Sequence, residues 1–192
     1  MFLSLLLRPS LPEADVPLIP LAAGVGILEA LRCLGALAEL KWPNDLLIAG
    51  RKVGGVLAEA AWGEGGLDSV VVGAGVNVAV DPGAEPGLVS RDATSLAVEL
   101  GRDVPVEDVA ALVLEQLALW YHRLAAGGRT DIVEAWRARS VPWWGRSVEV
   151  NVGARSLRGV ACGIDDTGAL LVEVDGRVQT IVAGEAQALR LG

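Results

Sequence analysis

The order of apolar and polar residues predicts a mixture of strands and helices. Residues 1–8 form a short apolar run that stops at Arg8-Pro9, which is typical of a buried strand. Residues 21–34 show apolar positions at helical spacing, with Gly35 just beyond them, and they predict a buried helix. The four prolines in residues 8–20 indicate an exposed loop between the two elements.

The centre of the chain first favours strands and then helices. Residues 40–62 predict a meander of strands that turns at Gly50, and residues 69–80 predict a further β-branched strand after a loop at 63–68. Helices are expected at 94–100, at 106–126 and at 131–140, where flanking prolines and glycines supply the start and stop signals.

The last quarter of the chain has the pattern of a small β domain. Short strands are predicted at 147–152, 156–165, 169–174, 178–184 and 189–191. Five strands of this spacing favour a small SH3-like barrel. Because the earlier strands and helices follow no regular βαβ period, the fold class is α+β, with one domain at 1–140 and a second at 141–192. Trp143 and Trp144 are expected to pin the two domains together.

Composition excludes several classes of protein. The chain has 192 residues, of which 52% are apolar and 21% charged, so it can bury a core. Its net charge of −8 and its lack of a basic cluster argue against nucleic acid as a partner. No stretch of about 18 apolar residues is free of charge or turn residues, so membrane spanning is not expected. Cys33 and Cys162 lie far apart, which favours buried free thiols in a reducing cytoplasm.

Lysine is scarce in this sequence. Lys41 and Lys52 are the only two lysines, whereas the chain has fourteen arginines. An ammonium group is a compact point charge, and it can sit between a carboxylate and a phosphate where a planar guanidinium cannot. Asn44 and Asn77, two of the three asparagines, lie in glycine-flanked strand segments nearby. The glycines at 54, 55, 73 and 75 either admit a ligand close to the backbone or only let strands cross tightly, and both readings stay open.

Three blocks of sequence resemble the biotin protein ligase family. They are Lys41-Trp42-Pro43-Asn44-Asp45, the run from Arg51 to Glu59, and Gly73-Ala74-Gly75-Val76-Asn77, in the family's order and at similar separations. The resemblance covers essentially the whole chain. It implies a catalytic domain related to class II aminoacyl-tRNA synthetases, followed by the SH3-like domain.

The resemblance also implies an activity. Such an enzyme uses ATP with Mg²⁺ to convert biotin to biotinyl-AMP, and it then transfers biotin to a lysine of a biotin carboxyl carrier domain in a biotin-dependent carboxylase. No tightly bound cofactor and no metal site of the protein's own are implied. Whether the enzyme forms a homodimer stays open.

By the same resemblance, individual residues receive roles. Lys41 is the catalytic cation, and it contacts both the biotin carboxyl group and the α-phosphate. Substrate-binding residues are Lys41, Trp42, Asn44, Gly54 and Gly55, and nucleotide-binding residues are Lys52, Gly73, Gly75 and Asn77. Asp45 and Glu59 are expected to support them, Asp45 by holding Lys41, Asn44 or magnesium. Trp42 is expected mainly to pack beneath the lysine, and Glu59 is otherwise a carboxylate that faces solvent.

The sequence departs from the family's pattern before Lys41. The family carries a Ser/Thr-rich segment and a Gly-Arg-Gly-Arg loop upstream of the strand that residues 1–8 resemble, and neither occurs before Lys41 here. We expect a misplaced start or a truncated gene to account for this. An alternative function therefore stays open, that of an inactive biotin-binding or carrier-docking remnant.

Overall fold

An antiparallel sheet forms the centre of the first domain. The computed structural model describes residues 1–79 and 93–188, and it confirms the α+β fold class. Within these residues the five strands of the sheet run in the order β1-β5-β4-β3-β2. Their bounds are Phe2–Leu7 for β1, Ala38–Lys41 for β2, Asp45–Ile48 for β3, Arg51–Gly63 for β4 and Gly66–Val76 for β5.

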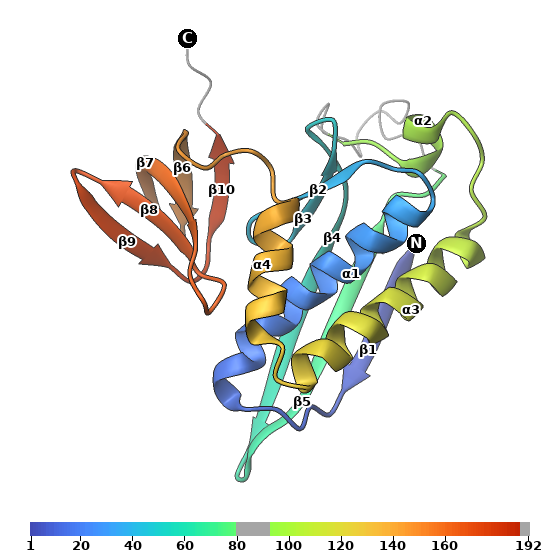
Figure 1. Ribbon diagram of the computed structural model, residues 1–192, viewed down its shortest axis with the longest axis horizontal. Coiled ribbons are helices and arrows are strands. Elements are labelled where there is room, and N and C mark those ends of the chain that lie inside the picture. Colours follow the sequence, from blue (N-terminus) through green and yellow to red (C-terminus); the bar gives the residue numbers. More distant parts are fainter. Residues whose placement is uncertain (80–92, 189–192) are drawn as a thin grey trace.

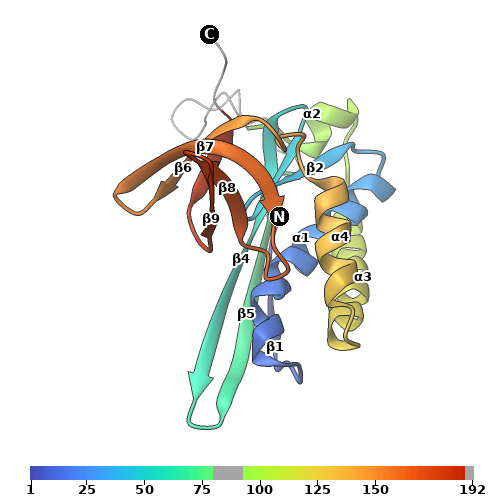
Figure 2. The same ribbon diagram turned by 60° about the vertical axis from the view of Figure 1, so that its left-hand side comes forward.

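Helices cover one face of this sheet and leave the other face open (Figures 1 and 2). The helices are α1 (Ile19–Cys33), α2 (Leu96–Leu100), α3 (Val106–Ala125) and α4 (Arg129–Arg139), and α1, α3 and α4 pack on the sheet. A Cβ at Gly26 would lie 3.0 Å from the Gln116 carbonyl oxygen, so this glycine lets α1 and α3 pack closely. Apolar side chains of α1, such as Val25, Ile27 and Leu28, are fully buried against the sheet and α3.

The segment before α1 is more ordered than the sequence predicts. Glu13–Leu18 forms a 3₁₀ helix, η1, in which Asp15 and Leu18 are buried, so the expectation of an exposed loop over 8–20 is wrong there. The reason is an ion pair between Asp15 and Arg129 of α4, which fastens the segment to the domain. Together, η1 and α1 are long and apolar enough to span a membrane by length and composition alone. However, 67% of the most apolar window is buried in the fold, as in a core helix.

Two boundaries in the centre of the chain also differ from expectation. The loop expected at 63–68 shrinks to the turn at Glu64-Gly65, because β4 and β5 form one long hairpin that projects past the sheet (Figure 2). The helix expected at 94–100 begins at Leu96, because the Ser95 side chain caps it by accepting a hydrogen bond from the Val98 N–H. Residue 80, the last of the strand expected at 69–80, lies outside the described part of the chain.

A second antiparallel sheet follows α4. Its described strands are β6 (Ser147–Val152), β7 (Arg155–Ile164), β8 (Leu170–Val174), β9 (Arg177–Ile181) and β10 (Glu185–Ala188), in the order β10-β6-β7-β8-β9. The first four match the predicted strands closely. The fifth does not, because β10 is the less apolar segment 185–188, and the predicted strand at 189–191 lies outside the described residues.

Both cysteines are exposed, so the expectation that they are buried core residues is wrong. Cys33 is the last residue of α1, where the helix leaves the core. Cys162 sits at an irregularity in the β7–β8 pairing, between Ala161 and Gly163, where the backbone bulge turns it outward.

The two domains meet beside β2. The Val141 N–H donates to the Leu40 carbonyl at 2.8 Å, so the connection between the domains runs along the edge of β2. The Trp42 indole N–H donates to the Gly168 carbonyl of the second domain at 3.0 Å. Trp144 lies against Trp136 of α4, with ring centroids 6.4 Å apart. The turn between β2 and β3 is therefore attached to the second sheet.

Candidate active site

One line of residues crosses all five strands of the first sheet. The pairing register joins Lys41 to Asp45, Asp45 to Gly55, Gly55 to Gly75, and Gly75 to Phe2. Neighbouring strands lie about 4.8 Å apart, so this line is about 19 Å long. It has charged groups at one end, two glycines in the middle and an aromatic ring at the other end.

This line lies on the face of the sheet that no helix covers. Residues directly opposite each other in an antiparallel pair point to the same face, and along β5 the valines at 70, 72 and 76 are buried beneath the helices, whereas Gly75 is not. Phe2 is 95% exposed. A parallel line joins Leu57, Gly73 and Ser4. Apart from Lys41, which lies behind Asp45 at the end of the first line, the residues of the two lines form the floor and rims of an open cleft of about 480 Å³.

Both lysines of the chain contact the same carboxylate. The Lys41 ammonium lies 3.3 Å from Asp45 Oδ2, and the Lys52 ammonium pairs with Asp45 Oδ1. The Lys41 side chain is 15% exposed and that of Lys52 is 52% exposed. This end of the cleft thus holds two positive charges and one negative charge, and it can accept an anionic group although the whole protein is acidic.

The glycines of the cleft differ in whether the surrounding protein atoms leave space for a side chain. A Cβ at Gly54 would collide with the Gly75 carbonyl oxygen, so close strand packing requires glycine there. A Cβ at Gly73 or Gly75 would meet its nearest protein atom at 3.7 and 3.6 Å, which is ordinary contact. Packing therefore tolerates a side chain at Gly73 and Gly75, and the absence of one leaves room in the cleft. Gly55 lies beneath Asp45 and Lys52. A Cβ at this position would come to 3.2 Å from the Asn44 carbonyl oxygen, which is a modest clash.

The two predicted asparagines both line the cleft, and each already holds part of its wall. The Asn44 amide donates to the Val56 carbonyl at 2.7 Å, which braces the β2–β3 turn against β4. The Asn77 amide donates to the Thr94 carbonyl at 3.0 Å, and this contact fixes the segment that leads into α2.

The structure separates the remaining predicted residues from the cleft floor. Trp42 is only 3% exposed and turns toward the second domain, as a packing residue does. Lys41 reaches the cleft through Asp45 rather than lining it, and its ammonium lies 6.0 Å from the ring centroid of Trp143. Glu59 is exposed on β4, beyond the cleft. The cleft itself thus brings together Asn44, Asp45, Lys52, Gly54, Gly55, Gly73, Gly75 and Asn77.

Sequence reasoning missed the apolar side of the cleft. Phe2 and Leu57 line it, and each stands out in the sequence only as one apolar residue among many. Their positions follow from the pairing of β1 with β5 and of β5 with β4, which a single sequence does not reveal. A second missed feature is Glu99, which accepts hydrogen bonds from Arg51 at 2.6 Å and from Thr94 and so fastens α2 beside the cleft.

No group of three or more His, Cys, Asp or Glu side chains that could hold a metal ion occurs within residues 1–79 and 93–188. The arrangement suits a ligand with a neutral or apolar body over the glycines and a negative group at the lysines.

Solved structures share this architecture. Biotin protein ligase from Aquifex aeolicus, solved in complex with biotin and ATP, matches with a TM-score of 0.82 at 25% identity over 99% of this chain and 78% of that chain. The same enzyme without ligand gives a TM-score of 0.83. A helix-backed antiparallel sheet with an open cleft, followed by a small β domain, is thus the fold of a biotin protein ligase.

Sequence comparisons lead to the same family. The Biotin/lipoate A/B protein ligase family model matches residues 1–77, and the Biotin protein ligase C terminal domain model matches residues 144–188. A biotin–(acetyl-CoA-carboxylase) ligase of Paracoccus denitrificans is 34% identical over 95% of this chain and 77% of its own length. The bifunctional ligase/repressor BirA of Bacillus subtilis is 31% identical, and the chain spans 57% of its length. The chain belongs to the biotin protein ligase family.

Proposed function

We propose that the protein is an ATP-dependent biotin ligase, which forms biotinyl-AMP and transfers biotin to a lysine of a biotin carboxyl carrier domain. The line from Lys41 to Phe2 is the observation that carries the proposal. It offers an apolar rim and a flat floor to the body of biotin and a cationic end to its carboxylate. The relatives' names and the Aquifex complex with biotin and ATP support it.

In the first step, a carboxylate oxygen of biotin attacks the α-phosphorus of ATP. The bond from that phosphorus to the bridging oxygen of the β-phosphate breaks, and pyrophosphate leaves with the electron pair. Negative charge grows on the oxygens of the α-phosphate, and a fixed ammonium beside them lowers the barrier. We assign this task to Lys41, which Asp45 holds at 3.3 Å.

The more exposed Lys52 is proposed to meet the remaining phosphates, together with Asn77, and Gly73 and Gly75 are proposed to leave room where the nucleotide and the body of biotin lie next to each other. Asp45 has the role of holding both lysines before substrate enters. Magnesium would arrive with ATP and offset the charge of its phosphates. Gly55, Asn44 and Trp42 are proposed to shape the place where the biotin carboxylate meets the nucleotide.

In the second step, the neutral amine of the carrier lysine attacks the acyl carbon of biotinyl-AMP. The bond from that carbon to the phosphate oxygen breaks, AMP leaves, and the amine loses a proton as the amide forms. The partner is thus a carrier domain of a biotin-dependent carboxylase, an enzyme class expected in the cytoplasm.

The test uses the purified chain with MgATP and an apo carrier domain. Addition of biotin is expected to release pyrophosphate and to increase the carrier's mass by one biotinyl group. Biotin methyl ester is the matched control: it keeps the rings and loses the free carboxylate, so it is expected to release none. Calorimetric binding of biotin without pyrophosphate release would favour the non-catalytic biotin-binding alternative. Absence of binding would overturn both functions.

A further inference from the structure

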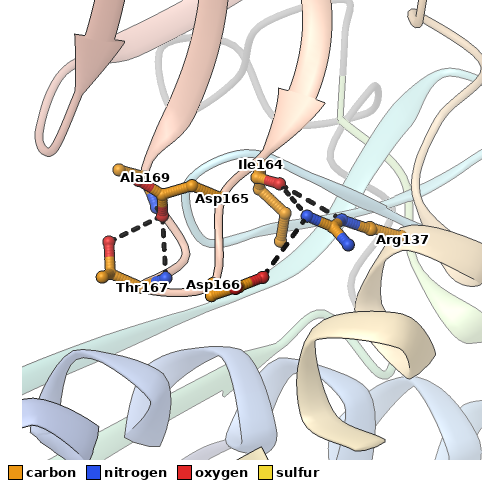
Figure 3. A network of polar contacts seen from close by, with 6 residues as sticks. All are labelled: Arg137, Ile164, Asp165, Asp166, Thr167 and Ala169. Atoms are coloured by element: carbon orange, nitrogen blue, oxygen red, sulfur yellow. Dashed lines mark hydrogen bonds and ion pairs between the residues drawn. The ribbon is translucent and has the colours of Figure 1, made fainter. Parts of the chain in front are cut away.

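The turn between β7 and β8, residues 164–169, is the main polar contact between the second sheet and the first domain. The carbonyl of Ile164, at one end of this turn, accepts hydrogen bonds from the Arg137 guanidinium of α4, with Nε at 3.2 Å. The carbonyl of Gly168, near its other end, accepts the Trp42 indole N–H at 3.0 Å. Figure 3 shows the Arg137 side of this arrangement.

Two backbone hydrogen bonds close the turn, from the Asp165 N–H to the Ala169 carbonyl at 2.9 Å and from the Gly168 N–H to the Asp165 carbonyl at 3.1 Å, and the Asp165 side chain adds three more. Oδ1 of Asp165 accepts hydrogen bonds from the Thr167 N–H at 2.8 Å, the Thr167 hydroxyl at 2.6 Å and the Ala169 N–H at 3.1 Å (Figure 3). All three bonds end on one oxygen inside the turn. Asp165 thus uses its carboxylate to order its own loop, and it makes no ion pair with any other residue of the described ranges 1–79 and 93–188.

The turn fits tightly against the first domain. Gly168 is buried, has a φ of +85°, and would place a Cβ 2.8 Å from a methyl group of Leu21 in α1. The backbone of the turn therefore has little freedom to shift without losing the bond to Trp42. Trp42 is covalently next to Lys41, and only residues 42–44 separate Lys41 from Asp45.

We propose that Asp165 is a positioning residue: by ordering the 164–169 turn it keeps the Gly168 carbonyl against Trp42, and through Trp42 it fixes the Lys41–Asp45 segment. The effect on catalysis rests on the proposed ligase function, whereas the effect on the position and mobility of this segment does not. The second domain in this way helps to hold Lys41 and Asp45 in position at the cationic end of the cleft.

Three variants separate this role from a general loss of stability. Asp165→Ala removes the acceptor. Asp165→Asn keeps Oδ1 and therefore all three hydrogen bonds. Asp166→Ala is the matched control, because it removes the neighbouring carboxylate. That carboxylate is 86% exposed, and its ion pair with Arg137 is long, at 4.0 Å, and therefore weak.

The first measurement is backbone hydrogen exchange, followed by mass spectrometry, in peptides that cover residues 38–48. Asp165→Ala is expected to speed exchange there about tenfold, while Asp165→Asn and Asp166→Ala stay at the wild-type rate. Unchanged exchange at 38–48 in a folded Asp165→Ala protein would overturn the proposal. Should Asp165→Ala fail to fold, Trp42→Phe removes the same contact from the other side, and its exchange at 164–169 must then rise.

The second measurement is biotin-dependent pyrophosphate release. Asp165→Ala is expected to lower kcat about tenfold with a smaller change in the KM for biotin, and Asp165→Asn is expected to restore it. If the wild-type protein has no activity, the proposed function is contradicted. The positioning role of Asp165 is then tested by hydrogen exchange at residues 38–48 alone. Wild-type kcat together with raised exchange at 38–48 would overturn the catalytic part of the proposal.

Discussion

Lys41 and Asp45 are direct partners across the β2–β3 pair, and their charged groups lie 3.3 Å apart at the end of an open cleft. Both side chains are about 15% exposed, so water screens this pair less than it screens a surface ion pair. The three-residue turn between them is anchored through Trp42 to the second domain. The ammonium therefore has a fixed position before any ligand enters.

Replacement of Lys41 by arginine should slow biotin-dependent pyrophosphate release about 100-fold, the effect of misplacing one preorganised charge at a transition state. The guanidinium keeps the charge, but it is planar and too broad to sit between Asp45 and Trp143 as the ammonium does. Lys52→Arg is the comparison variant: its side chain is 52% exposed and has room for a guanidinium, so this change should slow pyrophosphate release much less than Lys41→Arg does. Wild-type rates for Lys41→Arg would contradict the role assigned to Lys41.

Asp45→Asn should change stability and nucleotide binding in opposite directions. Two ammonium groups lose their shared carboxylate, so the free energy of unfolding should fall by about 1–2 kcal/mol. At the same time the cleft becomes more positive by one unit, and affinity for ATP should rise about fivefold, as for one charge at close range worth about 1 kcal/mol. Urea unfolding and calorimetry with ATP measure the two effects. Weaker binding of MgATP would indicate instead that Asp45 contacts magnesium.

Gly75→Ala and Gly54→Ala form a pair of variants with opposite expectations. A methyl group at Gly75 meets the Phe2 ring at 3.6 Å, so the protein should fold and gain about 0.5–1 kcal/mol of stability. The same methyl group narrows the cleft, and biotin binding should weaken about tenfold. At Gly54 the methyl group collides with the Gly75 carbonyl, and stability should fall by about 1–3 kcal/mol. Thermal unfolding and biotin calorimetry on both variants test this contrast, and unchanged binding in Gly75→Ala would place biotin elsewhere.

The second domain should lose stability in acid through Asp165. Partial burial acts to raise the pKa of Asp165, but hydrogen bonds from Thr167, Ala169 and Gly168 outweigh it, and the pKa lies below its ordinary value of 3.8. A lowered folded-state pKa means that the contribution is fully present above the unfolded-state pKa and is lost as the pH falls through the folded-state pKa. The stability difference between wild type and Asp165→Asn should be constant from pH 7 to about 5 and shrink below about 4. Urea unfolding across this range checks it, and a difference independent of pH would rule the carboxylate out.

Strong local patterns predicted most of the fold. The alternation in 147–152 and the helical spacing in 106–126 correspond to β6 and α3 nearly to the residue. The pattern failed where a distant contact decides, as for Asp15, whose ion pair with Arg129 orders a proline-rich segment. It failed also for Cys162, which follows the buried Ala161 and is exposed at an irregularity in the β7–β8 pairing.

The charged end of the site could be predicted from the sequence, whereas its apolar end could not. The scarcity of lysine and the KWPND block singled out Lys41 and Lys52, and both meet at Asp45. Phe2 could not be found in this way, since its place opposite Gly75 depends on a pairing between segments more than seventy residues apart. Gly54 is predicted to bind the ligand, and it lines the cleft, but its backbone contact with Gly75 also gives it a structural reason to be glycine, which the sequence does not reveal.

Two adjacent glycines at the centre of the sheet, Gly55 and Gly75, also limit how a ligand can be recognised. The peptide groups of central strands are engaged with their neighbours, so this floor has few hydrogen bonds to offer. The floor of the cleft can therefore distinguish ligands by the thickness of the part that lies over the glycines, and by little else. Chemical selectivity must therefore reside at the two ends of the cleft. Ligand analogues altered only in the part that lies over Gly55 and Gly75 should differ in affinity according to their size rather than their polarity.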